Sequence, residues 1–149
     1  MPIVEVGAAG LEQRTTIHLA EDNDDDILLI QAAFKEAKVP YQLEVVEDGA
    51  LAIQYLKGDG LYANRSRYPM PFLVLLDLKM PIMNGFEVLK WIREQPALDR
   101  LLVIVLSASQ LSADVSKAEQ LGTNSYLIKS SDYKQLTLFL QGLGTSNPE

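Results

Sequence analysis

Five short runs of apolar residues recur along the chain, and longer segments of mixed polarity separate them. The third run, Leu73-Val74-Leu75-Leu76, contains no polar residue. Such a run is typical of a strand that is buried on both faces of a parallel sheet, whereas strict alternation would indicate a half-exposed strand. The runs predict strands over residues 15–20, 41–46, 72–78, 102–106 and 125–128.

The intervening segments carry the period of amphipathic helices. Ile27, Ile30, Phe34 and Ala37 recur at helical spacing and predict one buried face. The predicted helices cover residues 24–38, 48–57, 84–94, 112–121 and 132–143. Strands that alternate with helices predict an α/β fold, a doubly wound parallel sheet with right-handed crossovers and helices on both faces.

Residues 58–71 interrupt this alternation. The segment is rich in Gly, Asn, Arg, Ser and Pro, and it exceeds the ~2–6 residues of an ordinary connection between a helix and a strand. It is predicted to be an extended loop, which is either a contact surface or a tolerated insertion. At the two ends, residues 1–14 are expected to form an arm and residues 145–149 a tail around one domain at 15–144.

Composition limits the functions that the chain can have. Its 149 residues suit one domain, and the absence of cysteine excludes disulfides and thiolate ligands. A net charge of −7 argues against nucleic acid as the main partner. No apolar run approaches the ~20 residues of a membrane span, and no secretory signal is evident at the start. We therefore expect a cytoplasmic protein that binds neither nucleic acid nor membrane.

Four of the predicted strands end in side chains that can carry chemistry. Glu21 and Asp22 follow the first strand, Asp77 the third, Ser107 the fourth and Lys129 the fifth. The carboxyl ends of parallel strands meet at one edge of a sheet, where open α/β folds place their ligand sites. A strand-end Asp can simply cap the next turn, but it can also accept a phosphoryl group as an acyl phosphate. Neighbouring carboxylates call for a cation such as Mg²⁺, which prefers oxygen ligands.

This ordered set resembles the receiver domain of two-component response regulators, over about residues 15–143. The resemblance rests on Glu21-Asp22, on Asp77 within LLDLKMPIMNG, on Ser107 of VLSAS and on Lys129 of YLIK. It implies the flavodoxin-like strand order 2-1-3-4-5 and a phosphoacceptor role for Asp77. It also implies that Lys129 pairs with the phosphoryl oxygens and that Ser107 donates to one of them.

The same resemblance implies a Mg²⁺ site at this edge. Asp22 and Asp77 would bind the cation directly, and Glu21 would act largely through water. The backbone carbonyl of Lys79 would complete the protein ligands. Phosphorylation and dephosphorylation would then be Mg-dependent reactions of the chain itself rather than turnover of a separate substrate.

A switch and a set of protein partners are further implications. Ser107 and Tyr126 match the family's switch pair, in which the ring turns inward when the hydroxyl moves toward the phosphoryl group. The donor would be a sensor histidine kinase, and output would pass to an unknown downstream protein. A homodimer is expected through the last helix, where Leu138 points away from the predicted buried stripe and Phe139 lies at its margin.

Within the family, the chain is most similar to stand-alone regulators that are paired with phytochromes, so a phytochrome-type kinase is the expected donor. That narrower resemblance rests on the long segment before the third strand and on Lys129-Ser130. Most receivers carry Pro after the lysine, joined by a cis peptide bond. A cis bond without proline costs ~3–4 kcal/mol, so the sequence leaves open whether this bond is cis or trans.

Two other functions are considered. A haloacid dehalogenase-type phosphohydrolase also uses a strand-end Asp and Mg²⁺, but it carries a second Asp two residues later, where this chain has Lys79. An interaction module that is never phosphorylated would not need the complete set of charged site residues.

Two features are given structural interpretations. Asp24, Asp25 and Asp26 are interpreted as solvated acids in the first turn of a helix, where they favour the helix dipole. His18, the only histidine, is interpreted as a packed side chain on a strand.

Overall fold

A parallel sheet of five strands forms the centre of the protein, whose computed structural model describes residues 15–145. The strand order is β2-β1-β3-β4-β5 and every pairing is parallel, which confirms the predicted fold class and strand order. The strands are β1 (Thr16–Ala20), β2 (Gln42–Val46), β3 (Leu73–Leu76), β4 (Leu102–Ser107) and β5 (Ser125–Ile128).

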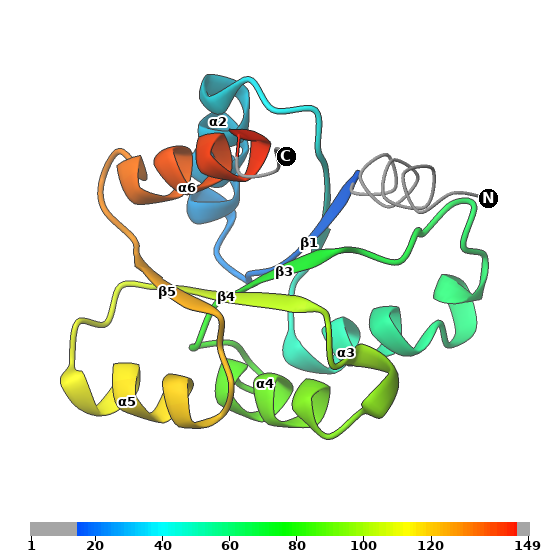
Figure 1. The fold of residues 1–149 in the computed structure, drawn as a ribbon. Coiled ribbons are helices and arrows are strands. Elements are labelled where there is room, and N and C mark those ends of the chain that lie inside the picture. The colour runs from blue at the N-terminus through cyan, green and yellow to red at the C-terminus, as the bar shows by residue number, and fades with distance from the viewer. Residues whose placement is uncertain (1–14, 146–149) are drawn as a thin grey trace, which may run out of the picture.

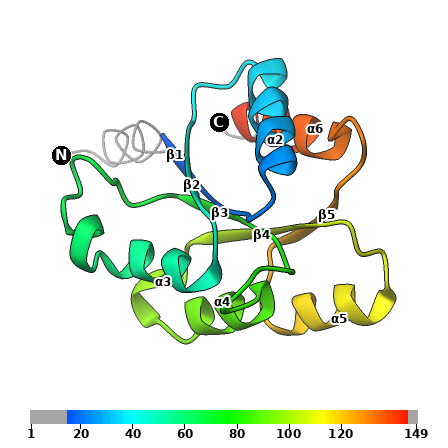
Figure 2. The same cartoon turned by 180° about the vertical axis from the view of Figure 1, so that it is seen from behind.

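Helices cover both faces of the sheet (Figures 1 and 2). Two of them, α2 and α6, lie together on one face, and α3, α4 and α5 lie on the other. The helices are α2 (Asp24–Ala37), α3 (Gly49–Lys57), α4 (Gly85–Arg93), α5 (Ser112–Gln120) and α6 (Lys134–Thr145). No helix within residues 15–145 is long and apolar enough to cross a membrane.

Strand β3 shows why the apolar runs are continuous. Its four residues are fully buried, and successive side chains point to opposite faces of the sheet. Leu73 and Leu75 belong to the core beneath α2 and α6, whereas Val74 and Leu76 belong to the core above α3 and α4. A strand with a core on each side has no polar face, so the sequence shows no alternation.

The segment at 58–71 is more structured than predicted. It contains a short 3-10 helix, η1 (Gly60–Ala63), and its later part is tied back to α3. The Arg65 guanidinium donates to the carbonyl oxygens of Tyr55 and Leu56 at 2.9 and 3.0 Å, at the end of α3. The expectation of a plain extended loop was therefore wrong, because one cation ties this segment to carbonyl oxygens at the end of α3.

Several boundaries also differ from the expected ones, and the third strand ends at Leu76 rather than at 78. The last helix begins at Lys134 rather than 132 and continues through Gly144 to Thr145, beyond the predicted end at 143. A second 3-10 helix, η2 (Pro96–Leu98), follows α4, which ends before Pro96 as expected. The predicted arm at 1–14 and residues 146–149 of the predicted tail lie outside the described residues.

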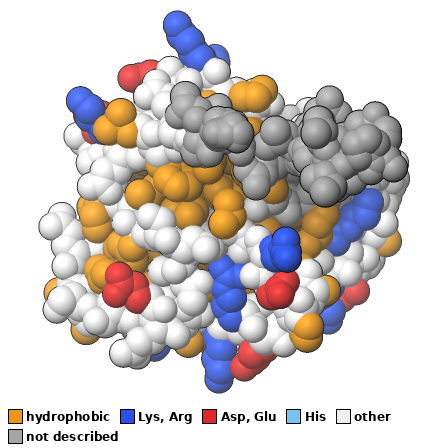
Figure 3. All heavy atoms as spheres, in the orientation of Figure 1, with side chains coloured by type: hydrophobic (Ala, Val, Ile, Leu, Met, Phe, Trp, Pro, Cys, Tyr) orange, Lys and Arg blue, Asp and Glu red, His pale blue; other side chains and the backbone are white. Residues whose placement is uncertain are grey.

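Figure 3 shows hydrophobic side chains gathered below α6, between that helix and the sheet. Leu102, Phe139 and Leu143 are partly buried against the core on this side of the sheet. Leu138 of α6 is different, since it is exposed and not part of that core.

Candidate functional site

The pairing of β1 with β3 brings the predicted acids together. Ala20 is paired with Leu76, so Glu21 and Asp77 leave the sheet side by side. Oxygens from Glu21, Asp22 and Asp77 all lie within 4.8 Å of one another. Glu21 and Asp77 are buried, whereas Asp22 is exposed at the mouth of the cluster. An open cluster of three carboxylates suits a hard divalent cation that keeps some of its water ligands.

Lys129 reaches this cluster from β5. Its backbone N–H donates to the Ser107 carbonyl at 2.8 Å, which extends the β4–β5 pairing beyond the last residue of the strand. Its ammonium nitrogen lies 2.8 Å from Glu21 Oε1 and 3.5 Å from Asp77 Oδ2. The sequence prediction that the strand ends converge at one edge is thus confirmed for the acids and for the lysine.

Burial raises the free energy of the ionised carboxylates in this cluster when no cation is bound. It raises the pKa of Glu21 to about 7, although the contact with Lys129 opposes the rise. Burial likewise raises the pKa of Asp77, again against the charge of Lys129. For Lys129 burial alone would lower the pKa, but its ion pairs with the carboxylates raise it. One ammonium does not neutralise three carboxylates, so a further positive charge would stabilise the site.

The loop after β3 connects the Asp77 carboxylate to the start of α4. Asn84 caps α4 by accepting from the Glu87 N–H at 3.0 Å, and Glu87 accepts from the Asn84 N–H at 2.8 Å. This reciprocal pair fixes the first turn of α4. The Lys79 N–H donates to Asp77 Oδ1 at 3.4 Å, which helps to orient the carboxylate. The proposed contribution of the Lys79 carbonyl to a metal site stays a prediction.

Asp26 is a site residue that the sequence interpretation missed. Its Oδ2 lies 2.9 Å from the Lys129 ammonium nitrogen, and its Oδ1 accepts a hydrogen bond of 2.6 Å from the Tyr133 hydroxyl. The interpretation of Asp26 as a solvated acid was wrong, whereas Asp24 and Asp25 are exposed as expected. The helical spacing could have predicted this position, because Asp26 precedes the buried Ile30 by four residues and therefore lies on the same face of the helix.

The segment after Lys129 leads into α6. There is no cis peptide bond within residues 15–145, so the bond between Lys129 and Ser130 is trans. The Ser130 hydroxyl lies 3.1 Å from Asp132 Oδ1, which also accepts from the Lys134 N–H at 3.1 Å. Ser130 thus contributes to the start of α6.

Comparison with known proteins identifies the family of this chain. The sequence model of the response regulator receiver domain family matches residues 17–141. The chain belongs to the response regulator receiver family. It is 38% identical over 127 residues to the response regulator Rcp1 of Synechocystis sp., covering 85% of this chain and 84% of Rcp1.

Solved receiver structures agree with this assignment. The phosphorylated cyanobacterial phytochrome response regulator RcpA superimposes with a TM-score of 0.78 at 37% identity, covering 91% of this chain and 97% of RcpA. The Mn²⁺-bound form of Rcp1 gives a TM-score of 0.74 at 36% identity, covering 88% of this chain and 92% of Rcp1. The resemblance to stand-alone phytochrome regulators is therefore confirmed, and the phosphohydrolase alternative is not favoured.

The predicted switch residues of this receiver both bond to Ser109. Ser107 is buried at the end of β4, and its Oγ accepts from the Ser109 N–H at 3.1 Å. Tyr126 on β5 is half-buried, and its hydroxyl donates to the Ser109 carbonyl at 2.9 Å. Both side chains therefore bond to the same short loop after β4.

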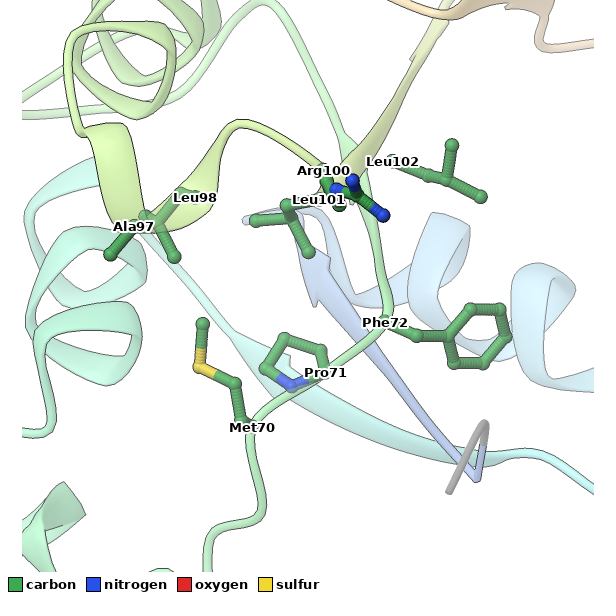
Figure 4. Close-up of a pocket in the computed structure, with 8 residues that line it drawn as sticks. All are labelled: Met70, Pro71, Phe72, Ala97, Leu98, Arg100, Leu101 and Leu102. Carbon is green, nitrogen blue, oxygen red and sulfur yellow. The ribbon is translucent and has the colours of Figure 1, made fainter. Parts of the chain in front are cut away.

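A cavity of about 330 Å³ lies elsewhere, at the opposite edge of the sheet. Figure 4 shows Met70 and Pro71, before β3, facing Ala97 and Leu98 of η2. None of the site residues described above lines it. The cavity is therefore separate from the charged cluster at the carboxyl edge of the sheet.

His18 takes no part in the charged cluster. It is fully buried on β1, with its ring stacked on Tyr55 at a centroid distance of 4.4 Å. Its Nδ1 lies 3.3 Å from the Glu44 carbonyl oxygen of the neighbouring strand. The prediction of a packed strand residue is confirmed.

Proposed function

We propose that Asp77 accepts a phosphoryl group from a sensor histidine kinase of the phytochrome type, and that phosphorylation changes the contacts of this receiver with other proteins. The observation that carries the proposal is the meeting of the Asp77 carboxylate with the Lys129 ammonium and two further acids at one sheet edge. That arrangement combines a nucleophile with the means to neutralise phosphoryl charge.

Transfer proceeds by attack of an Asp77 oxygen on phosphorus. A P–O bond forms while the P–N bond to the donor histidine breaks, and the electron pair of that bond stays on the imidazole nitrogen. The Lys129 ammonium pairs with one phosphoryl oxygen, and the Ser107 hydroxyl donates to another. Both groups stabilise charge that spreads over these oxygens in the transition state.

Asp22 and Asp77 would hold Mg²⁺ directly, with Glu21 acting through water and the Lys79 carbonyl as a further ligand. When bound, the cation would neutralise charge on the phosphoryl oxygens. The three carboxylates fit a divalent cation by their oxygen donors and their spacing. The related Rcp1, described in a Mn²⁺-bound form, supports a divalent cation here. Water then hydrolyses the acyl phosphate and resets the site.

The signal leaves through Ser107, Tyr126 and α6. Movement of the Ser107 hydroxyl toward the phosphoryl group would break its bond with the Ser109 N–H, and the loop that holds Tyr126 would then rearrange. A local bond of this kind can bias an element that has two stable arrangements. The changed surface is read by a second copy of the chain and by a downstream protein in the cytoplasm.

Self-association through α6 is part of this proposal. Leu138 is 57% exposed, whereas Leu136 and Leu140 of the same helix are fully buried. An exposed leucine beside a partly apolar surface suits an isologous contact between two copies. Phe139 is half-buried against the core, so it contributes less free surface than Leu138.

Intact mass spectrometry tests the phosphoacceptor function against the alternatives. We expect acetyl phosphate with Mg²⁺ to add one phosphoryl group to the protein. We also expect no release of p-nitrophenol from p-nitrophenyl phosphate, because a phosphoester has a poorer leaving group than an acyl phosphate. Steady release of p-nitrophenol would support the phosphohydrolase instead, and no mass gain with any donor would support an unphosphorylated module.

A further inference from the structure

We propose that Asp26 and Tyr133 are positioning residues for Lys129: Asp26 anchors the ammonium group while its other partners change during phosphorylation, and Tyr133 holds Asp26. The inference rests on the proposed function, since it concerns how Lys129 serves phosphoryl transfer to Asp77. It adds two side chains to the residues that act in the site, one from α2 and one from the segment before α6.

The ammonium group of Lys129 has three N–H donors and faces three carboxylates. The distances from its nitrogen are 2.8 Å to Glu21, 2.9 Å to Asp26 and 3.5 Å to Asp77. Lys129 is mostly buried, so these contacts replace water rather than compete with it. The two short contacts hold the nitrogen, and the longer one leaves it near the nucleophile.

Two of these three partners change during the proposed reaction. The Asp77 carboxylate is consumed when it becomes an acyl phosphate, whose negative charge lies on the phosphoryl oxygens, and Glu21 is drawn toward a cation when one is bound. Asp26 belongs neither to the nucleophile nor to the cluster of possible metal ligands. It is therefore the one constant acceptor among the three contacts of Lys129. A lysine has a flexible four-carbon stem, so without this anchor its ammonium group would explore positions away from the phosphoryl oxygens.

Tyr133 fixes the orientation of Asp26. Its hydroxyl donates to Asp26 Oδ1 at 2.6 Å, which leaves Oδ2 for Lys129 at 2.9 Å. Tyr133 is 2% exposed, so the donor side of this bond is shielded from solvent, whereas Asp26 remains partly exposed. Charge-assisted hydrogen bonds of this length are among the stronger ones in proteins.

The backbone of Tyr133 is also held in an unusual position. Its φ of 51° lies in the left-handed region, which an aromatic residue rarely adopts. The Tyr133 N–H donates to the Ser130 carbonyl at 3.1 Å, and the Tyr133 carbonyl accepts from the Thr137 N–H at 3.0 Å. These bonds connect the residue after Lys129 to the first turn of α6, so Tyr133 has a fixed place from which to hold Asp26.

Lysine ammonium NMR tests the anchor without requiring phosphorylation. A mostly buried ammonium that is held by carboxylates exchanges its protons slowly, so we expect a resolved ¹H–¹⁵N signal that is missing in Lys129→Met. The signal should persist when Mg²⁺ is added to the unaltered protein. It should broaden beyond detection in Asp26→Asn with Mg²⁺, and it should remain in Asp25→Asn, which loses the same charge from an exposed position in the same turn. No signal in the unaltered protein, or an identical signal in Asp26→Asn and Asp25→Asn, would overturn the proposal.

Phosphorylation kinetics provide the second readout. At saturating Mg²⁺, we expect the rate of phosphoryl uptake from acetyl phosphate to fall about tenfold in Asp26→Asn and about threefold in Tyr133→Phe, with Asp25→Asn unchanged. In a Lys129→Met background, Asp26→Asn should have no further effect, because it acts through the lysine. An equal loss in both backgrounds would show that Asp26 acts independently of Lys129.

The two readouts separate this inference from the proposed function. If the unaltered protein takes up no phosphoryl group but its Lys129 signal depends on Asp26, the proposed function fails and the anchor stands as a structural fact. If uptake is normal in every Asp26 and Tyr133 variant, the proposed function stands and the positioning role is wrong.

Discussion

Gly85 packs against the backbone of Asp77 so closely that a Cβ atom at Gly85 would overlap the Asp77 carbonyl. The first turn of α4 therefore rests directly on the peptide that carries the nucleophile. We predict that Gly85→Ala destabilises the fold by about 1–3 kcal/mol, because neither backbone can move away freely. Gly142→Ala is the matched control, since nothing lies within 4 Å of its added Cβ. It should stabilise α6 by about 0.5–1 kcal/mol.

Urea denaturation of both variants measures these changes. The expected result is opposite signs for the two substitutions. Equal midpoints for Gly85→Ala and the unaltered protein would mean that the contact between α4 and Asp77 is looser than described.

Asp22 offers a direct test of the metal site. It is the exposed member of the carboxylate cluster, so its replacement should leave the fold intact. We predict that Asp22→Ala weakens Mg²⁺ binding by about tenfold or more, because losing a direct ligand costs at least as much as losing an outer partner. Isothermal titration calorimetry measures this affinity, with Asp25→Ala as the control for loss of charge. Equal affinity in Asp22→Ala and the unaltered protein would exclude Asp22 as a ligand.

His18 makes the stability of the protein sensitive to acid. Burial lowers its pKa from 6.5 to about 4, and the charge of Arg65 adds to the effect. The unfolded chain therefore binds a proton between pH 6.5 and about 4 that the folded protein does not bind, so stability falls as the pH decreases through this range. The full contribution is on the order of 3 kcal/mol.

Two measurements test this prediction. Since the chain has a single histidine, NMR titration of its ring reports His18 without ambiguity, and we expect a titration midpoint at about pH 4. In His18→Phe, which can retain the stacking on Tyr55, the loss of stability between pH 6.5 and 4 should be smaller. A ring pKa near 6.5 would contradict the prediction.

The sequence allowed the fold and most of the site to be predicted, because both depend on where strands end. Continuous apolar runs identified buried parallel strands, and parallel strands necessarily bring their carboxyl ends to one edge. Asp77, Glu21, Asp22 and Lys129 could therefore be expected at one edge, and the resemblance to receiver domains supplied the strand order that brings them together.

What escaped prediction depends on contacts between distant segments. The link from Asp26 to Tyr133 requires α2 and α6 to lie side by side, and the two residues are 107 positions apart. The tether from Arg65 to the end of α3 requires a turn within the segment at 58–71, which has no periodic pattern. Local spacing predicts periodic elements, but it does not predict which polar side chains will meet across them.

Leu138 tests the proposed dimer surface. We predict that Leu138→Lys lowers the dimer fraction in analytical ultracentrifugation, because it places a charge at the centre of an apolar contact. Leu61→Lys is the control, since Leu61 is 68% exposed on η1, far from α6 in the fold (Figure 1). Phe139 is unsuitable for this test, because a charge there would also disturb the core. Unchanged association in Leu138→Lys, with and without phosphorylation, would place the dimer contact elsewhere.

The phosphoacceptor role of Asp77 is the central claim, and intact mass spectrometry of Asp77→Asn tests it most directly. Asparagine keeps the shape of the side chain but removes the nucleophilic carboxylate, while Lys129, Glu21 and Asp22 remain in place. After incubation with Mg²⁺ and acetyl phosphate, we expect the unaltered protein to gain one phosphoryl group and Asp77→Asn to gain none. An undiminished gain in Asp77→Asn would contradict the account, because the phosphoryl group would then be on another residue.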